Sequence, residues 1–152
     1  MARTILLAVF TLSFVVSHSS TFASEQMPTS SDLPIVVTDD AGRRVELAEP
    51  AKRIVALAPH IVENLFSAGA GSALVGAVEY SDYPPEAKSI PRVGGYGSHS
   101  VEAIVALKPD LVVAWAQAGA EKLAAQLAPM GVVVYVSDPR SQADIARYIR
   151  HI

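Results

Sequence analysis

Short runs of Val, Ile, Leu and Ala alternate along this chain with stretches whose apolar residues recur every three or four positions. The runs predict strands buried on both faces, over residues 54–58, 74–78, 111–114 and 132–136. The intervening stretches predict helices over 61–68, 101–107 and 121–127, and from Ser141 onward. Alternation of this kind predicts an α/β fold, an open and mostly parallel sheet with helices on both faces, as in a Rossmann-like lobe.

A different pattern precedes this lobe. Residues 35–38 and 44–47 are two short strand-like runs, and Gly42 lies in the turn between them. They predict a β-hairpin. We therefore divide the chain into a flexible lead-in and hairpin over 24–50 and a lobe over 51–152. The last predicted helix has only about three turns when the sequence stops, which suggests a chain truncated in that helix.

The first 23 residues read as a secretory signal peptide. Arg3 is their one charged residue, an apolar run covers 5–16, and Thr21-Phe22-Ala23 offers small residues at the cleavage positions. A membrane anchor is the alternative, but this run is shorter than the roughly 20 residues that span a bilayer. We expect an exported, soluble protein of the periplasm, not inserted in the membrane.

Composition narrows the choice of partner. Of the 152 residues 51% are apolar, the formal charge is −3, and no cluster of Lys and Arg occurs. Nucleic acid is therefore not expected as a partner. The chain has no cysteine, which excludes a lipoprotein and thiolate metal sites. No enzyme motif is present, so we expect no catalytic residue, no metal site and no cofactor.

The candidate ligand-binding residues follow the predicted strands. In an open parallel sheet, ligands bind beyond the carboxyl ends of the strands. His60, Tyr80 and Trp115 each come shortly after a strand or end one, and Tyr96 lies in the long loop over 79–100. Aromatic residues at this edge suit a flat, partly apolar ligand. The alternative is that they fill a small core within the loop, and for Tyr83 we favour that alternative.

Three further polar residues could have a function, and His60 has two interpretations. His60 is either an ordinary residue of a helix start or a ligand of a metal or heme iron. His99 lies in a polar loop, where we expect it to be solvated. Glu102 lies in the first turn of a predicted helix, where a carboxylate favourably meets the helix dipole.

Three motifs resemble one known family. RIVALAP (53–59), VEYSDYPP (78–85) and VEAIVALKPDLVVAW (101–115) resemble the amino-terminal lobe of periplasmic cobalamin-binding proteins. These belong to the iron-siderophore, heme and cobalamin receptors of ABC importers. The resemblance runs from about Lys52 to the end of the chain. It implies binding without catalysis, with cobalamin as the transported ligand and the permease of an ABC importer as partner.

The resemblance also assigns roles to residues. It implies that Tyr80 and Trp115 contact the corrin ring, that Tyr96 is a further contact, and that Glu102 pairs with arginines of the permease. His60 stands where a small residue is expected, which leaves direct metal contact open. Such receptors hold ligand between two lobes, so we expect a monomer that binds weakly when it has one lobe alone.

Three rival functions remain at this point. The first is binding of heme or a ferric siderophore on the same scaffold. The second is an enzyme of the doubly wound class, with its catalytic groups in further sequence. The third is a truncated paralogue that binds no ligand.

Overall fold

The computed structural model describes residues 34–95 and 97–151. The predicted signal peptide and Tyr96 lie outside these residues. Among the described helices, none combines the length and apolar character that crossing a bilayer requires.

The central element is a four-stranded parallel sheet. Its strands are β3 (Ile54–Ala56), β4 (Leu74–Ala77), β7 (Leu111–Trp115) and β8 (Val133–Ser137). They pair in the order β4-β3-β7-β8. Each of them matches a run predicted from the sequence to within two residues. The predicted fold class, a mostly parallel α/β sheet behind a short hairpin, is confirmed.

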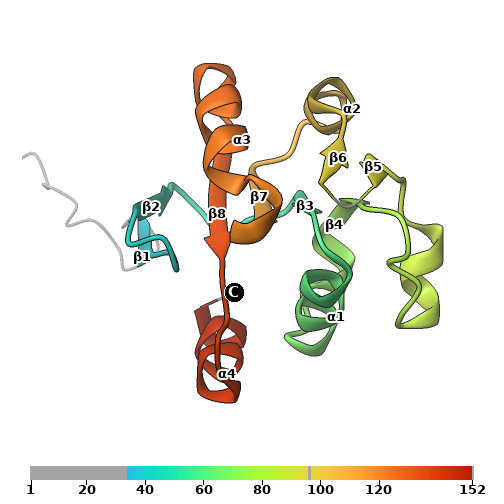
Figure 1. Ribbon diagram of the computed structural model, residues 1–152, viewed down its shortest axis with the longest axis horizontal. Coiled ribbons are helices and arrows are strands. Elements are labelled where there is room, and N and C mark those ends of the chain that lie inside the picture. Colours follow the sequence, from blue (N-terminus) through green and yellow to red (C-terminus); the bar gives the residue numbers. More distant parts are fainter. Residues whose placement is uncertain (1–33, 96, 152) are drawn as a thin grey trace, which may run out of the picture.

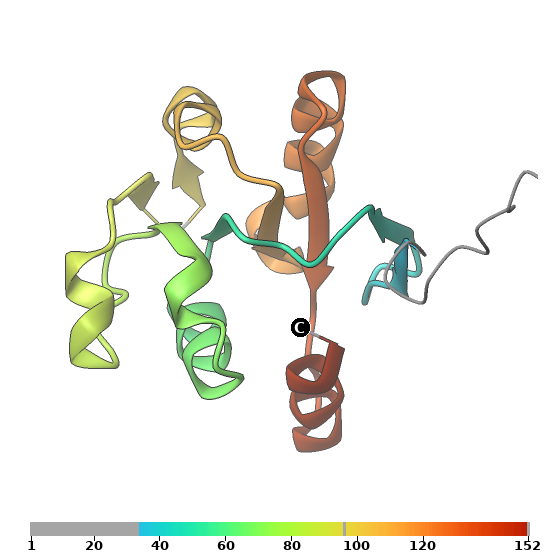
Figure 2. The same ribbon diagram turned by 180° about the vertical axis from the view of Figure 1, so that it is seen from behind.

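Helices cover both faces of this sheet (Figures 1 and 2). Helices α1 (Pro59–Ser67) and α4 (Gln142–His151) lie against each other on one face. On the opposite face lie α2 (Val101–Ala106) and α3 (Ala120–Leu127). Two apolar cores result, one around Ile61 and Leu65 of α1 and the other around Ile104, Leu123 and Leu127. Burial on both sides explains why the strands are almost continuously apolar.

The termini of two helices follow the sequence closely. Helix α1 begins two residues before the prediction because Pro59 occupies its first turn, where a missing N–H costs nothing. Helix α4 follows Ser141, whose hydroxyl accepts a hydrogen bond from the backbone N–H of Asp144 (3.2 Å) and donates one to its carboxylate (2.8 Å). The predicted start of this helix at Ser141 is confirmed, and the two hydrogen bonds cap its first turn as a variant of the capping box.

The loop over 79–100 contains more structure than the sequence predicted. It forms a short 3₁₀ helix, η2 (Pro85–Ser89), and a two-stranded ribbon of β5 (Gly94–Gly95) and β6 (Ser98–His99). Three more single-turn 3₁₀ segments lie elsewhere: η1 (Gly71–Ala73), η3 (Ala116–Ala118) and η4 (Ala128–Met130).

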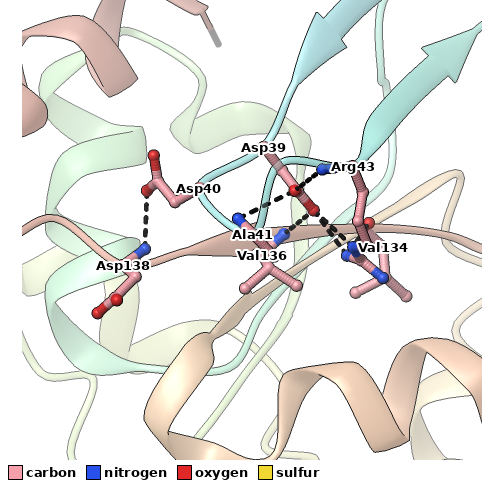
Figure 3. Close-up of polar contacts among 7 residues, drawn as sticks. All are labelled: Asp39, Asp40, Ala41, Arg43, Val134, Val136 and Asp138. Carbon is pink, nitrogen blue, oxygen red and sulfur yellow. Dashed lines mark hydrogen bonds and ion pairs between the residues drawn. The ribbon is translucent and has the colours of Figure 1, made fainter.

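The hairpin of β1 (Ile35–Thr38) and β2 (Arg44–Leu47) has the predicted strand boundaries, with Gly42 in its turn at φ 76°. Its turn docks on the free edge of β8 (Figure 3). The buried carboxylate of Asp39 accepts hydrogen bonds from the backbone N–H of Val136 (3.2 Å) and from the guanidinium of Arg43 (2.7 and 2.9 Å). Arg43 also donates to the carbonyl of Val134 (3.1 Å).

Asp40 completes this docking. Its backbone N–H donates to the carbonyl of Val136 (3.0 Å), and its carboxylate accepts from the backbone N–H of Asp138 (2.7 Å). The outward backbone groups of β8 are thereby paired as a fifth strand would pair them. The hairpin is thus attached to the sheet at the strand that leads into α4.

Candidate ligand-binding site

The topology of the sheet defines a switch point between β3 and β7, which we call the crevice. Strand β3 connects through α1 to β4, whereas β7 connects through α3 to β8, and the two helices lie on opposite faces. The chain therefore leaves the two central strands, β3 and β7, in opposite directions. Ligands of open α/β sheets bind at the carboxyl ends of the strands at such a point.

His60 and Trp115 meet at this crevice. His60 lies in the first turn of α1, just beyond β3, and Trp115 is the last residue of β7. Their ring centroids are 5.2 Å apart and their planes are inclined by 83°, an edge-to-face contact. Both side chains are half-buried. The structure therefore brings together two of the residues predicted as ligand contacts, although no pattern in the sequence indicated that they touch.

Burial sets the charge state of His60. It lowers the pKa of the imidazole below its ordinary 6.5, although the negative charge of Glu63 acts in the opposite direction. The ring of His60 makes no hydrogen bond to any residue in the described part of the chain. At neutral pH the imidazole is therefore uncharged and keeps a nitrogen lone pair available.

Tyr80 stands at the same edge, three residues beyond β4. Its side chain is 80% exposed, and its backbone adopts φ 64°, a left-handed conformation that is unfavourable for a bulky residue. Arg92 holds the loop that carries it, because its guanidinium donates to the carbonyl of Ser81 (2.9 Å) and to those of Ala87 and Ile90. An exposed aromatic ring in a strained backbone conformation is typical of a binding site.

Tyr96 was also predicted as a contact, but it lies outside the described residues. The neighbouring prediction for Tyr83 is wrong. Its side chain is 68% exposed and does not fill a core of the loop. It borders a shallow depression of about 430 Å³ beside α1, shared with Glu63 and Phe66. The apolar core of this loop is formed by Ala87 and Ile90 instead.

The expectation for His99 is also wrong. The side chain is half-buried rather than solvated, and its buried Nδ1 has no hydrogen-bond partner among the described residues. Burial lowers the pKa of its imidazole. A polar neighbourhood in the sequence could not reveal this, because the ribbon of β5 and β6 turns His99 toward Val101 and Leu123, with which it lines a common depression.

Glu102 lies in the first turn of α2, as predicted, and is exposed. Hydrogen bonds from its own backbone N–H and from the hydroxyl of Ser100 (2.8 Å) lower the pKa of its carboxyl group. It therefore stays ionised at neutral pH and presents a negative charge to solvent.

Two further residues lie at the site, and sequence reasoning missed one of them, Arg92. Arg92 shapes the loop behind Tyr80, and the only sign of it in the sequence is a charged residue placed between Pro91 and the buried Val93. Ser137 is the β8 partner of Trp115, is 1% exposed, and has no hydrogen bond from its hydroxyl within the described residues. The bonds of Arg92 to nearby carbonyls depend on how the loop folds, which a local pattern cannot show, whereas Ser137 directly follows a predicted strand.

No group of three or more His, Asp and Glu that could hold a metal ion is found in the described part of the chain. The site thus consists of aromatic rings and one neutral imidazole. Such a set is suited to holding a flat molecule by contact area.

Comparison with known proteins identifies relatives of this chain. The vitamin B12-binding protein of Vibrio cholerae serotype O1 is 41% identical over 97 residues, which are 64% of this chain and 35% of that protein. The crystal structure of the periplasmic vitamin B12-binding protein of Vibrio cholerae matches with a TM-score of 0.60 and 39% identity, over 67% of this chain and 41% of that one.

A second class of solved structures is also similar. The heme-binding protein HmuT matches with a TM-score of 0.68 and 27% identity, over 82% of this chain and 42% of that one. The chain therefore spans well under half the length of these relatives. The family model described as periplasmic binding protein matches residues 54–152. On this match, the chain belongs to the periplasmic binding protein family.

Proposed function

We propose that this chain forms the cobalamin-binding lobe of a periplasmic receptor that delivers a corrinoid to an ABC importer. The observation that carries the proposal is the meeting of His60 and Trp115 at the crevice between β3 and β7, with the exposed Tyr80 on the same edge. Relatives named vitamin B12-binding protein support the choice of ligand.

In this proposal the protein binds and carries, and does no chemistry. The corrin ring rests against Tyr80 and Trp115, with Tyr96 as a further contact from the loop. Each well-packed aromatic contact contributes about 1 kcal/mol beyond the area that it buries. The signal peptide over 1–23 directs the chain to the periplasm, where it acts as a soluble monomer.

Heme is the second candidate ligand. The similarity to HmuT, which is named a heme-binding protein, shows that the scaffold is shared with receptors of another metal macrocycle. His60, a neutral imidazole at the crevice, offers the type of nitrogen that heme iron accepts.

Titration calorimetry with cyanocobalamin and with hemin tests the proposal. We expect saturable heat with cyanocobalamin, and a loss of about fivefold in affinity when Tyr80→Ser removes one ring contact. Tyr83→Ser is the matched control, because Tyr83 is similarly exposed in the same loop but lies over α1. We expect it to leave affinity unchanged.

Two results would overturn the assignment. Saturable binding of hemin without any binding of cyanocobalamin would make heme the ligand. No heat with either compound, from a chain whose circular dichroism shows it folded, would favour a paralogue that binds no ligand.

Docking to the permease is a separate part of the proposal. Glu102 presents an ionised carboxylate at the surface of α2, and an opposite charge on the permease would attract it. We expect Glu102→Lys to weaken binding to a cobalamin importer reconstituted in nanodiscs. Glu121→Lys, at the first turn of α3 and equally exposed, is the control; an equal effect of both would count against a specific role for Glu102.

A further inference from the structure

His60 occupies the middle of the proposed site. The strand before it, β3, lies between β4, which precedes Tyr80, and β7, which ends at Trp115. Neighbouring strands lie about 4.8 Å apart. The strands that carry the two aromatic residues are therefore separated by about 10 Å, and His60 follows the strand between them.

This placement suits the shape of the ligand class. A planar metal macrocycle that rests on Tyr80 and Trp115 presents the centre of its face, where the metal is, to the position between them. The edge-to-face contact with Trp115 fixes one side of the His60 ring. Its nitrogens are left without a hydrogen-bond partner among the described residues.

Resting on the proposed function, we infer that the imidazole of His60 binds the metal of the macrocycle as an axial ligand and selects macrocycles whose axial position is exchangeable. The step is a ligand exchange on the metal. The metal–oxygen bond to a water molecule breaks, a bond from the imidazole nitrogen lone pair forms, and the water leaves. No electron is transferred and no proton moves.

The protonation state of His60 supports this role. Only the neutral imidazole can donate its lone pair to a metal. Burial at the crevice lowers the pKa of His60, so the uncharged form prevails at pH 7. Cobalt(III) in aquocobalamin and ferric iron in hemin share the required chemistry, whereas in cyanocobalamin a cyanide holds the axial position.

Absorbance spectroscopy tests the inference, because a change of axial ligand shifts the absorption bands of the macrocycle. The full chain is titrated at pH 7 with aquocobalamin, cyanocobalamin and hemin in separate arms. We expect a band shift with aquocobalamin, no shift with cyanocobalamin, and about tenfold tighter binding of aquocobalamin, because only aquocobalamin gains the bond to His60.

Two variants separate ligation from packing. His60→Phe keeps an aromatic ring against Trp115 but has no nitrogen, and His60→Gln is a second, polar replacement. Both should abolish the band shift and lower the affinity for aquocobalamin about tenfold more than they lower the affinity for cyanocobalamin. His99→Gln, at the other half-buried histidine of the described chain, should keep the wild-type spectrum.

Every other outcome of these titrations either supports or overturns the inference, and some also decide the proposed function. Binding of both corrinoids with equal affinity and no shift would overturn the inference and leave the proposed function standing. The same shift in His60→Phe as in wild type would also overturn it. A His60-dependent shift with hemin alone would support the inference and replace the proposed ligand. Binding of none of the three compounds would overturn both.

Discussion

At the scale of the residue, the candidate site depends on side chains held in unusual states. Tyr80 keeps a large apolar ring in solvent on a left-handed backbone, and His60 keeps an imidazole uncharged against an indole. The arrangement of Tyr80 does not stabilise the isolated fold. It is explained if the residue is positioned for a ligand, since strain and exposure of this kind are retained where function requires them.

Replacing Tyr80 with glycine should separate stability from binding. Glycine adopts φ 64° without steric cost, so we expect Tyr80→Gly to raise the free energy of unfolding by up to about 1 kcal/mol. The same change removes the ring and should weaken the binding of cyanocobalamin. Urea unfolding and calorimetry on one preparation measure the two effects. Lower stability together with unchanged binding would contradict this interpretation of Tyr80.

The two half-buried histidines predict how stability depends on pH. Burial lowers the pKa values of His60 and His99 below 6.5. As the pH falls through 6.5, the unfolded chain binds protons that the folded chain does not, so the free energy of unfolding decreases toward the pKa values of the folded state. A double variant, His60→Gln with His99→Gln, should lose less stability than wild type.

Urea unfolding at a pH of about 7.5 and of about 5.5 measures this difference, because these values lie on either side of the ordinary pKa of histidine. A wild-type protein that gained stability on acidification would contradict the assigned charge states.

At the scale of the element, local patterns predicted most of the fold. Strand runs, the hairpin and the serine cap of α4 were readable because each depends on residues close together in sequence. The docking of the hairpin on β8 could not be predicted in this way, because Asp39 and Val136 are 97 positions apart. The role of Arg92 was not readable for a different reason: its bonds join nearby residues, but they depend on how the loop that carries Tyr80 folds.

Asp39 should account for much of the attachment of the hairpin. Its carboxylate is buried and accepts bonds from Arg43 and from Val136 on the edge of β8. Asp39→Ala leaves these donors unpaired, and we expect a loss of about 3 kcal/mol in the free energy of unfolding.

Glu46→Ala provides the comparison within the same hairpin. It breaks the exposed ion pair between Glu46 and Arg44 (2.7 Å), which should cost less than about 1 kcal/mol. Equal losses from the two variants, measured by urea unfolding, would show that the Asp39 network does not hold the hairpin to the sheet.

At the scale of the whole molecule, the site arises from topology. The helices after β3 and β7 leave to opposite faces, and this alone creates a crevice at the carboxyl ends of the two central strands. The edge was predictable from the strand pattern, and so was the position of Tyr80 and Trp115 beside it. The contact between His60 and Trp115 could not be predicted, since it depends on the strand order, which the sequence pattern left open.

The choice of ligand also belongs to this scale, because it depends on which molecule binds in the crevice. Trp115 is the single tryptophan of the chain, so its fluorescence reports on this crevice alone. A titration with cyanocobalamin should quench that fluorescence to a plateau, because the corrin ring would lie against the indole. A free tryptophan derivative in the same solutions corrects for light absorbed by the ligand. Quenching that never saturates and merely follows the free derivative would contradict the placement of a corrinoid at this crevice.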